Sequence, residues 1–326
     1  MFIQFLGTSS GTPTKQRNVS GLALQESKGR SWYLVDCGEA TQHQLLHTKL
    51  SLNTLKGIFI THVHGDHCYG LPGLLGSAGM TGRTETLTIV APAGIREWIE
   101  ATQRFTEFHL SFELNFVLPE ALMLNQDNDF PEMTFGQFNV AATPLIHRVE
   151  SYAYSFTENW VDGELDVAGL RASDLPAGSD WGRLKSGIDV SHDGKLYRAR
   201  DFVITDSVPR KVVVCGDNAE PAVLKDLCNS CDVLIHEATY AKELAEQAAT
   251  YGHSYAEQVA AFAAQQAIPN LLLTHFSPRY QLNPQVKSSV DLLRQEARTV
   301  YRGALFLAED LHRYRLDKEG GLHAEQ

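Results

Sequence analysis

Short apolar segments rich in β-branched and aromatic residues alternate along the chain with amphipathic stretches. The first pattern predicts strands, and the second predicts helices. We expect strands at Phe2–Leu6, Gly21–Leu24, Trp32–Asp36, Gly57–Ile60, Leu87–Ala91, Phe138–Ala142, Lys211–Cys215, Val233–His236 and Asn270–Thr274. We expect helices at Glu39–Thr48, Ala93–Phe105, Ala219–Cys228, Tyr255–Gln266 and Pro284–Arg294. This alternation predicts an α/β fold.

The stretch between Thr157 and Pro209 breaks the pattern, because it is rich in glycine and has few sustained apolar periods. A loop of this length inside a compact domain is uncommon unless it has a function or projects outward. The sequence leaves two interpretations open. The stretch is either a surface meander without a role or an arm that contacts a partner or a substrate.

Composition places the chain among globular proteins. Its 326 residues are 43% hydrophobic and 21% charged, which predicts a sizeable buried core. The longest apolar runs fall far short of the ~18 residues that a membrane span needs. The N-terminus has no basic stretch ahead of a long apolar region, and the five scattered cysteines suit reduced thiols. We therefore expect a cytoplasmic protein without a membrane partner.

The net charge of −11 argues against a general nucleic-acid binder, since phosphate contacts need clustered lysine and arginine. Any RNA function must come from bound cations or from local basic residues. Lys15 and Arg17 lie in an N-terminal loop, and a second basic run extends from Lys195 to Lys211.

Four side chains with metal-ligating groups follow the apolar segment at Gly57–Ile60. His62 and His64 alternate on an extended segment, so they point the same way. The glycine after them lets the chain turn, which brings Asp66 and His67 to a second position nearby. Imidazole and carboxylate groups at this spacing predict a zinc site.

One such cluster does not complete a binuclear site, and three further candidates follow apolar strands. They are His147, Asp217 and His275. Ligands at strand ends are what an open α/β sheet presents along one edge. With the first cluster, these residues supply the seven ligands that two metal ions need.

Longer segments around these residues resemble the metallo-β-lactamase superfamily and, within it, the short-form ribonuclease Z (tRNase Z) family. The resemblance extends over nearly the full chain. It rests on LVDCGEATQHQLLHT (34–48), THVHGDH (61–67), YGLPGLLGS (69–77), CGDN (215–218), HEATYAKE (236–243), HSYAEQ (253–258) and THFSPRY (274–280). Residues 13–18 are similar to the PxKxRN loop of that family.

The resemblance implies a fold and a metal site. The fold is an αββα sandwich, two mixed β-sheets flanked by helices, in one domain covering residues 1–326. Segment 158–187 occupies the place of the family's substrate-binding arm. Two zinc ions per subunit are implied, one held by His62, His64 and His147 and the other by Asp66, His67 and His275, with Asp217 bridging them.

The resemblance also implies an activity, the removal of the 3′ trailer from precursor tRNA by a homodimeric endoribonuclease. The products are a tRNA 3′-OH and a trailer 5′-phosphate. Asp66 orients or deprotonates the attacking water, His253 protonates the leaving group, and Glu237 orients His253. The implied substrate-binding residues are Lys15, Arg17 and Asn18.

Two other functions compete with this interpretation. A small-molecule hydrolase acting on a thioester, lactone or phosphodiester would explain the metal ligands but not the PxKxRN-like loop. An inactive RNA-binding protein is hard to reconcile with seven intact ligand positions. Cleavage of a trailer-bearing tRNA with and without chelator separates the three.

Overall fold

The structure is a computed structural model and describes residues 1–123, 133–205 and 207–325. The chain divides into two compact units. The main unit combines Met1–Phe156 with Lys211–Gln326, and the inserted unit is Thr157–Arg210.

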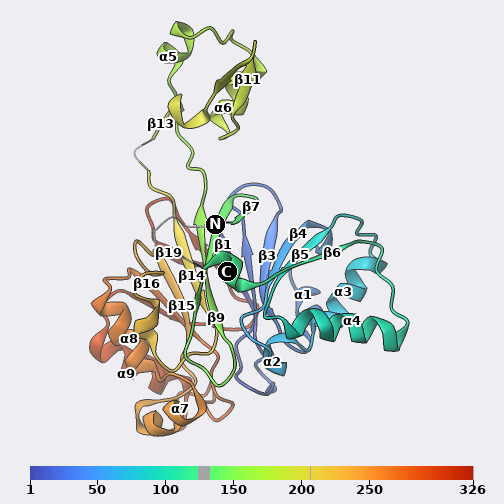
Figure 1. Cartoon of the computed structure of the whole chain (residues 1–326). Coiled ribbons are helices and arrows are strands. Elements are labelled where there is room, and N and C mark those ends of the chain that lie inside the picture. The colour runs from blue at the N-terminus through green and yellow to red at the C-terminus, as the bar shows by residue number, and fades with distance from the viewer. Residues whose placement is uncertain (124–132, 206, 326) are drawn as a thin grey trace. The chain divides into compact units, whose positions relative to one another are not determined.

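Two mixed sheets form the centre of the main unit (Figure 1). The first sheet contains, in spatial order, β19 (Leu322–Glu325), β18 (Arg313–Leu316), β1 (Phe2–Gly7), β2 (Gly21–Gln25), β3 (Trp32–Cys37), β4 (Leu55–Phe59), β5 (Leu87–Val90) and β6 (Leu114–Val117). The second contains β17 (Ala304–Leu307), β16 (Asn270–Thr274), β15 (Val233–Glu237), β14 (Lys211–Cys215), β9 (Tyr152–Glu158), β8 (Phe138–Pro144) and β7 (Met133–Phe135). Strands β3 to β6 are parallel, as are β14 to β17.

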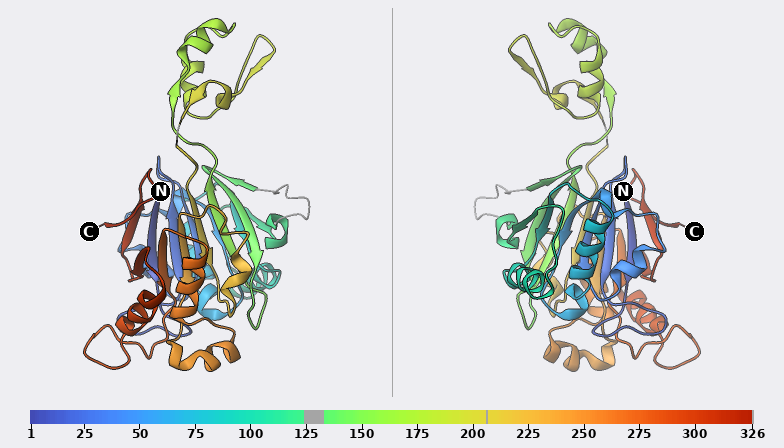
Figure 2. Two further views of the ribbon diagram at one scale, coloured as in Figure 1. Left: turned by 90° about the vertical axis from the view of Figure 1, so that its left-hand side faces the viewer. Right: turned by 90° about the vertical axis from the view of Figure 1, so that its right-hand side faces the viewer.

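Helices cover the outer side of each sheet (Figures 1 and 2). Beside the first sheet lie α1 (Thr41–Leu45), α2 (Gly65–Cys68), α3 (Leu71–Met80) and α4 (Gly94–Thr106). Beside the second lie α7 (Ala245–Tyr251), α8 (Ala256–Gln265) and α9 (Val290–Val300). The predicted αββα sandwich is confirmed.

Alternating side chains of the inner strands explain these layers. In β3, Tyr33 and Val35 enter the core between the two sheets, whereas Trp32 and Leu34 enter the core beneath the helices. Strand β14 divides its valines in the same way between the inter-sheet core and the core under α8 and α9. Strands that are buried on both faces need continuous apolar sequence, which is what the chain supplies here.

The core between the sheets is built around Phe59. Its ring lies 5.0 Å, centroid to centroid, from the rings of both Phe135 and Phe156, and 5.3 Å from that of Tyr154. The contacts are edge-to-face, the arrangement that aromatic quadrupoles favour. Because the rings come from both sheets, the cluster joins the two sheets.

The predicted strands all exist, with ends that differ by at most two residues. One predicted helix is wrong, because Ala219–Cys228 contains only a 3₁₀ turn at Pro221–Leu224. The helix expected at Pro284–Arg294 exists as α9, but it begins six residues later, at Val290. The Ser289 hydroxyl accepts a hydrogen bond from the backbone N–H of Asp291, which makes Ser289 the N-cap and delays the helix.

The inserted unit has an apolar core of its own, formed by Leu170, Leu175, Leu184, Val190, Tyr197 and Ala199. Its helices are α5 (Val167–Ala172) and α6 (Ser179–Lys185), and its short strands are β10 (Glu164–Leu165), β11 (Val190–His192), β12 (Lys195–Tyr197) and β13 (Val203–Ile204). The unit is longer than segment 158–187, because the β11–β12 hairpin packs into the same core. A role as a substrate-binding arm stays a prediction.

Buried ion pairing closes the ends of the inserted unit. The Arg210 guanidinium donates to the Glu158 carboxylate, with Nε 2.8 Å from Oε2, and both side chains are about nine-tenths buried. Lys195 pairs with Asp174 at 3.2 Å. Part of the second basic run therefore neutralises the acidic residues of the unit itself.

Within the described ranges, no helix is long and apolar enough to cross a bilayer. The five cysteines are all buried and unpaired, in agreement with the expectation of reduced thiols.

We expect Phe59→Ala to lower the free energy of unfolding by about 3–5 kcal/mol, the usual cost of removing a fully buried phenyl ring. Phe105→Ala is the matched control, because Phe105 is 79% exposed. Urea unfolding followed by circular dichroism measures both. Equal effects of the two substitutions would show that Phe59 does not hold the sheets together.

Candidate metal centre

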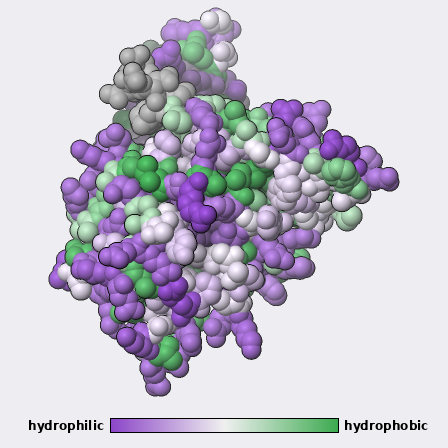
Figure 3. Space-filling model, turned by 60° about the horizontal axis from the view of Figure 1, so that its bottom comes forward, coloured by the Kyte–Doolittle hydropathy of each residue, from purple (hydrophilic) through white to green (hydrophobic). Residues whose placement is uncertain are grey.

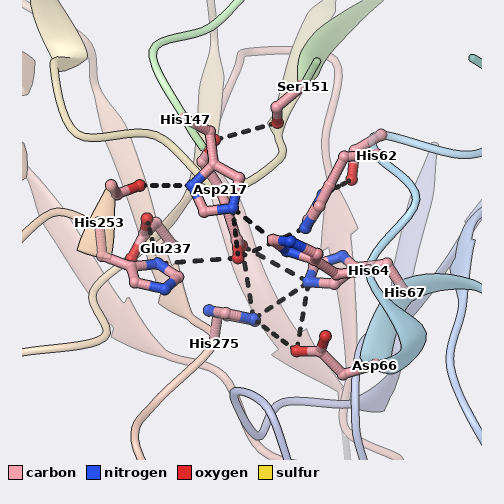
Figure 4. Close-up of polar contacts among 12 residues, drawn as sticks. His62, His64, Asp66, His67, His147, Ser151, Asp217, Glu237, His253 and His275 are labelled. Atoms are coloured by element: carbon pink, nitrogen blue, oxygen red, sulfur yellow. Dashed lines mark hydrogen bonds and ion pairs between the residues drawn. The ribbon is translucent and has the colours of Figure 1, made fainter. Parts of the chain in front are cut away.

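The seven predicted ligands converge at one end of the main unit, where the parallel strands finish (Figure 4). His62 and His64 follow β4, and the short helix α2 carries Asp66 and His67. His147 follows β8, Asp217 follows β14 and His275 follows β16. The site is therefore assembled from both sheets.

Among the described residues, three groups of side chains bring their ligand atoms within 4.8 Å of one another. Two of them contain the seven predicted ligands, and the third combines Asp217 and His275 with His253. The first contains His62, His64, His147 and Asp217, and the second contains Asp66, His67 and His275. Ring nitrogens approach closely in both groups: His64 Nδ1 lies 3.2 Å from His147 Nε2, and His67 Nε2 lies 3.1 Å from His275 Nε2. Nitrogens about 2.0–2.1 Å from a tetrahedral ion would lie ~3.3–3.4 Å apart, so these distances fit a metal site.

Asp217 is 3% exposed and lies between the two groups. Its Oδ2 faces His62 Nε2 at 3.6 Å and His147 Nε2 at 3.9 Å. Its Oδ1 faces His67 Nε2 at 3.5 Å and His275 Nε2 at 3.4 Å. Each oxygen thus faces a different set of imidazoles, and a bridging role of Asp217 stays a prediction.

Asp36 orients His67 directly and His62 through Thr61, by contacts on the side of each ring away from the site. Its Oδ2 accepts a hydrogen bond from His67 Nδ1 at 2.6 Å. The Thr61 hydroxyl donates to the same carboxylate and accepts from His62 Nδ1 at 3.0 Å. Both contacts make Nδ1 the protonated nitrogen, so each Nε2 presents its lone pair to the site.

Two further acceptors orient the histidines of the second sheet. The Gly252 carbonyl accepts from His147 Nδ1 at 2.6 Å. The Thr239 hydroxyl lies 3.0 Å from His275 Nδ1 and donates to the buried Glu237 carboxylate. Both Nε2 atoms again face the centre, which is how metal-bound histidines are held.

Electrostatics favour a cation here. Burial lowers the pKa of His62 well below its ordinary value, and its buried Nε2 has no hydrogen-bond partner among the described residues. Burial also lowers the pKa of His67, but Asp36, Asp217 and Asp66 outweigh it and raise that pKa well above the ordinary value. Three clustered carboxylates require positive charge, and divalent ions would supply it.

His253 lies beside the two groups, between α7 and α8, and its Nδ1 is 3.0 Å from Glu237 Oε1. Burial lowers the pKa of His253, but the charge and hydrogen bond of Glu237 outweigh it and raise the pKa to about 9. Burial raises the pKa of Glu237, whereas His253 lowers it to about 2. A divalent cation bound at Asp217 would lower the pKa of His253 towards neutral pH.

The three residues expected to bind substrate lie in different settings. Lys15 is exposed. Arg17 is 5% exposed, and its Nη1 donates to the Thr8 hydroxyl and the Ala308 carbonyl. Asn18 donates from Nδ2 to the Glu39 carbonyl. Arg17 is thus held by contacts inside the protein, and a role of these three residues in substrate binding stays a prediction.

The surface at this end of the main unit is largely hydrophilic, with smaller apolar patches (Figure 3).

Comparisons with known proteins agree with this geometry. A ribonuclease Z from Pseudomonas putida strain GB-1 is 46% identical over 323 residues, covering 99% of each chain. The chain belongs to the ribonuclease Z family. Another ribonuclease Z, from Bacillus subtilis strain 168, is 42% identical over 283 residues, which are 86% of this chain and 90% of that protein.

Structural comparison extends the relationship. The crystal structure of human tRNase Z, short form, superposes with a TM-score of 0.67 at 26% identity, covering 97% of this chain and all of that chain. A family model described as anti-Pycsar protein Apyc1 matches residues 1–104, the N-terminal part only. With the histidine and aspartate clusters, the ribonuclease Z fold indicates a metal-binding enzyme.

Sequence reasoning gave no role to Asp36, Thr61 or Thr239, although all three lie inside segments that carry the family resemblance. Asp36 is 25 positions from Thr61, and Thr239 is 36 positions from His275. Only the fold shows that they touch the ligands. One signal was available for Asp36, since a buried strand that ends in a carboxylate needs a partner for it.

We expect Asp36→Asn to weaken metal binding by about 10–100-fold, the usual effect of removing an outer hydrogen-bond partner of a metal ligand. Asparagine tolerates the positive φ of 59° at this position, so the backbone is not strained. Competition with a chromogenic chelator measures the affinity.

Asp226→Asn makes the same chemical change at an exposed position and serves as the control. An Asp36→Asn variant that holds metal as tightly as this control would show that Asp36 does not support the site.

Proposed function

We propose that this chain is a metal-dependent endoribonuclease that removes the 3′ trailer from precursor tRNA. The observation that carries the proposal is the convergence of seven side chains into two metal-sized groups in a chain related over its full length to ribonuclease Z. A small-molecule hydrolase would need the same ions, and so it is treated as an outcome of the test below.

We assign two zinc ions to the two groups. His62, His64 and His147 would hold one ion and Asp66, His67 and His275 the other, with Asp217 between them. The imidazole ligands and the nitrogen separations of 3.1–3.2 Å support zinc in particular. Bound ions at such a site activate water and stabilise the attacking and leaving oxygens of an in-line displacement.

Asp66 is the candidate for handling the attacking water. Burial raises its pKa, but the charges and hydrogen bonds of His67 and His275 lower it well below the ordinary value. The carboxylate is therefore ionised, which suits it to accept a hydrogen bond from a water molecule and orient it. Displacement of the upstream 3′-oxygen from phosphorus would leave a 3′-OH on the tRNA and a 5′-phosphate on the trailer.

His253 is the candidate for protonating that oxygen. Its Nδ1 donates to Glu237 Oε1, which also accepts from the Asn218 backbone N–H at 2.9 Å. The other oxygen, Oε2, accepts from the Thr239 hydroxyl. With the Thr239 backbone N–H, which donates to Oε2 at 3.3 Å, four donors hold this carboxylate, so the imidazole has a fixed direction. Its Nε2 is left to face the substrate.

Substrate recognition draws on the exposed Lys15 and on the inserted unit. Divalent ions would supply the positive charge that an acidic chain otherwise lacks at the scissile phosphate.

A homodimer also stays a prediction. Leu46, which follows α1, is 77% exposed, and Met80, at the end of α3, is 90% exposed. The two helices are joined by a hydrogen bond between the side chains of Gln42 and Ser77. These exposed apolar side chains are candidates for a contact between subunits. Light scattering of the purified chain determines the oligomeric state.

Incubation with a trailer-bearing precursor tRNA should give one cut at the base of the trailer, with a 3′-OH on the tRNA. Prior treatment with chelator should abolish cleavage, and zinc should restore it. Sequencing of the new 3′ end identifies the product. Hydrolysis of a small diester without any cleavage of the precursor would instead identify a small-molecule hydrolase.

We expect His253→Ala to lower single-turnover cleavage by about 10²–10⁴-fold, as for the loss of a general acid, with metal content and tRNA binding unchanged. A phosphorothiolate substrate, whose sulfur leaving group needs no proton, should recover most of the rate. His43→Ala, at an exposed position of α1, is the control. A variant equally slow on both substrates would exclude His253 as the acid.

A further inference from the structure

The loop between β1 and β2, residues 8–18, is closed by its own backbone. The N–H groups of Thr8 and Ser9 donate to the Asn18 carbonyl at 2.9 and 2.8 Å. Within the loop, the N–H of Thr14 donates to the Arg17 carbonyl at 2.8 Å. The loop is thus a compact element with a defined shape.

This loop contacts the second group of candidate ligands directly. The Gly11 N–H donates to Asp66 Oδ2 at 2.7 Å. That oxygen is also the one that faces His275 Nε2, at 3.3 Å. The position of Gly11 therefore influences how the Asp66 carboxylate is turned.

The same loop also holds the backbone that follows His275. The N–H of Phe276 donates to the Thr8 carbonyl at 2.9 Å, and the N–H of Ser10 donates to the Phe276 carbonyl at 3.0 Å. His275 has a φ of +56°, a conformation that costs a residue with a side chain about 1–3 kcal/mol unless its surroundings enforce it. The loop supplies part of that enforcement.

Arg17 fastens the loop from inside. Its Nη1 lies 2.7 Å from the Thr8 hydroxyl and 2.9 Å from the Ala308 carbonyl, and its guanidinium lies 4.8 Å above the centre of the Phe276 ring. The Thr8 hydroxyl in turn donates to Asp310 Oδ1 at 2.6 Å, and Asp310 Oδ2 accepts from the Asn18 N–H. One buried cation thus joins both ends of the loop to the segment after β17.

A buried guanidinium is costly, and its Nη2 has no hydrogen-bond partner among the described residues. An arginine that served only to attract RNA would lie at the surface, as Lys15 does two positions earlier in the PxKxRN-like segment. The burial of Arg17 therefore indicates a task inside the protein.

We propose that Arg17, through Thr8 and Asp310, is a positioning residue for the ligand group of Asp66, His67 and His275. It holds the loop so that Gly11 turns the Asp66 carboxylate and Thr8 and Ser10 fix the backbone after His275. This inference rests on the proposed function, since it concerns the site to which phosphodiester cleavage is assigned. It makes Arg17 a determinant of the metal site and not of RNA affinity.

The test compares Arg17→Met with Arg30→Met. Methionine keeps the apolar contact with Phe276 but removes the charge and the hydrogen bonds. Arg30 is exposed in the turn between β2 and β3 and provides the same substitution away from the site. Each variant is assayed on bis(p-nitrophenyl) phosphate and on precursor tRNA, and its zinc affinity is measured by chelator competition.

We expect Arg17→Met to lower kcat by about 10–100-fold on both substrates and to weaken zinc binding by a similar factor. The KM for precursor tRNA, and the binding of tRNA to the metal-free protein, should stay within about twofold of the parent. Arg30→Met should match the parent in every measurement.

A raised KM for tRNA, with the small diester rate and the zinc affinity unchanged, would overturn the proposal and identify Arg17 as an RNA contact. If Arg17→Met fails to fold, Thr8→Val removes the connecting hydroxyl while leaving the buried arginine. The expected result is the same, a lower kcat on both substrates with an unchanged KM for precursor tRNA. The diester and zinc measurements do not involve tRNA. Failure of the parent to cut a trailer therefore refutes the proposed function without deciding the role of Arg17.

Discussion

Asp217 places one buried carboxylate between two sets of imidazoles at the end where strands of both sheets finish. Removing a carboxylate from water is costly unless positive charge or donors compensate it. The carboxylates raise the pKa of His67, but one imidazolium faces Asp36, Asp66 and Asp217 together and does not balance them. This arrangement makes sense when cations occupy the space between these groups, and the rest of the site is organised around that requirement.

Orientation of the histidines is distributed over distant parts of the chain. Asp36 and Thr61 act from the first sheet, whereas Thr239 and Gly252 act from the second. Each fixes Nδ1 as the donor and so directs Nε2 inward. Glu237 connects this framework to His253, which allows one carboxylate to support both a ligand and the proposed acid.

The chain carries a net charge of −11 and is expected to bind a polyanion, so the location of its positive charge matters. Several basic residues are used internally, as Arg17 and Arg210 show. Positive charge at the scissile bond would come from bound ions, which are concentrated at one point. Acidic residues elsewhere on the surface then need not oppose binding at the centre, because screening at physiological salt limits their reach to ~8 Å.

The sequence by itself determined the strands, because continuous apolar segments such as β3 and β14 need burial on both faces. It also determined the seven ligand candidates, because their spacing after those strands is local information. It misplaced the start of α9, which a single capping serine decides. Only the tertiary structure decided that Asp36 supports His67, that the inserted unit continues to Arg210, and that Arg17 points inward. These features depend on contacts between residues far apart in the chain, up to 291 positions for Arg17 and Ala308, and no local pattern encodes such contacts.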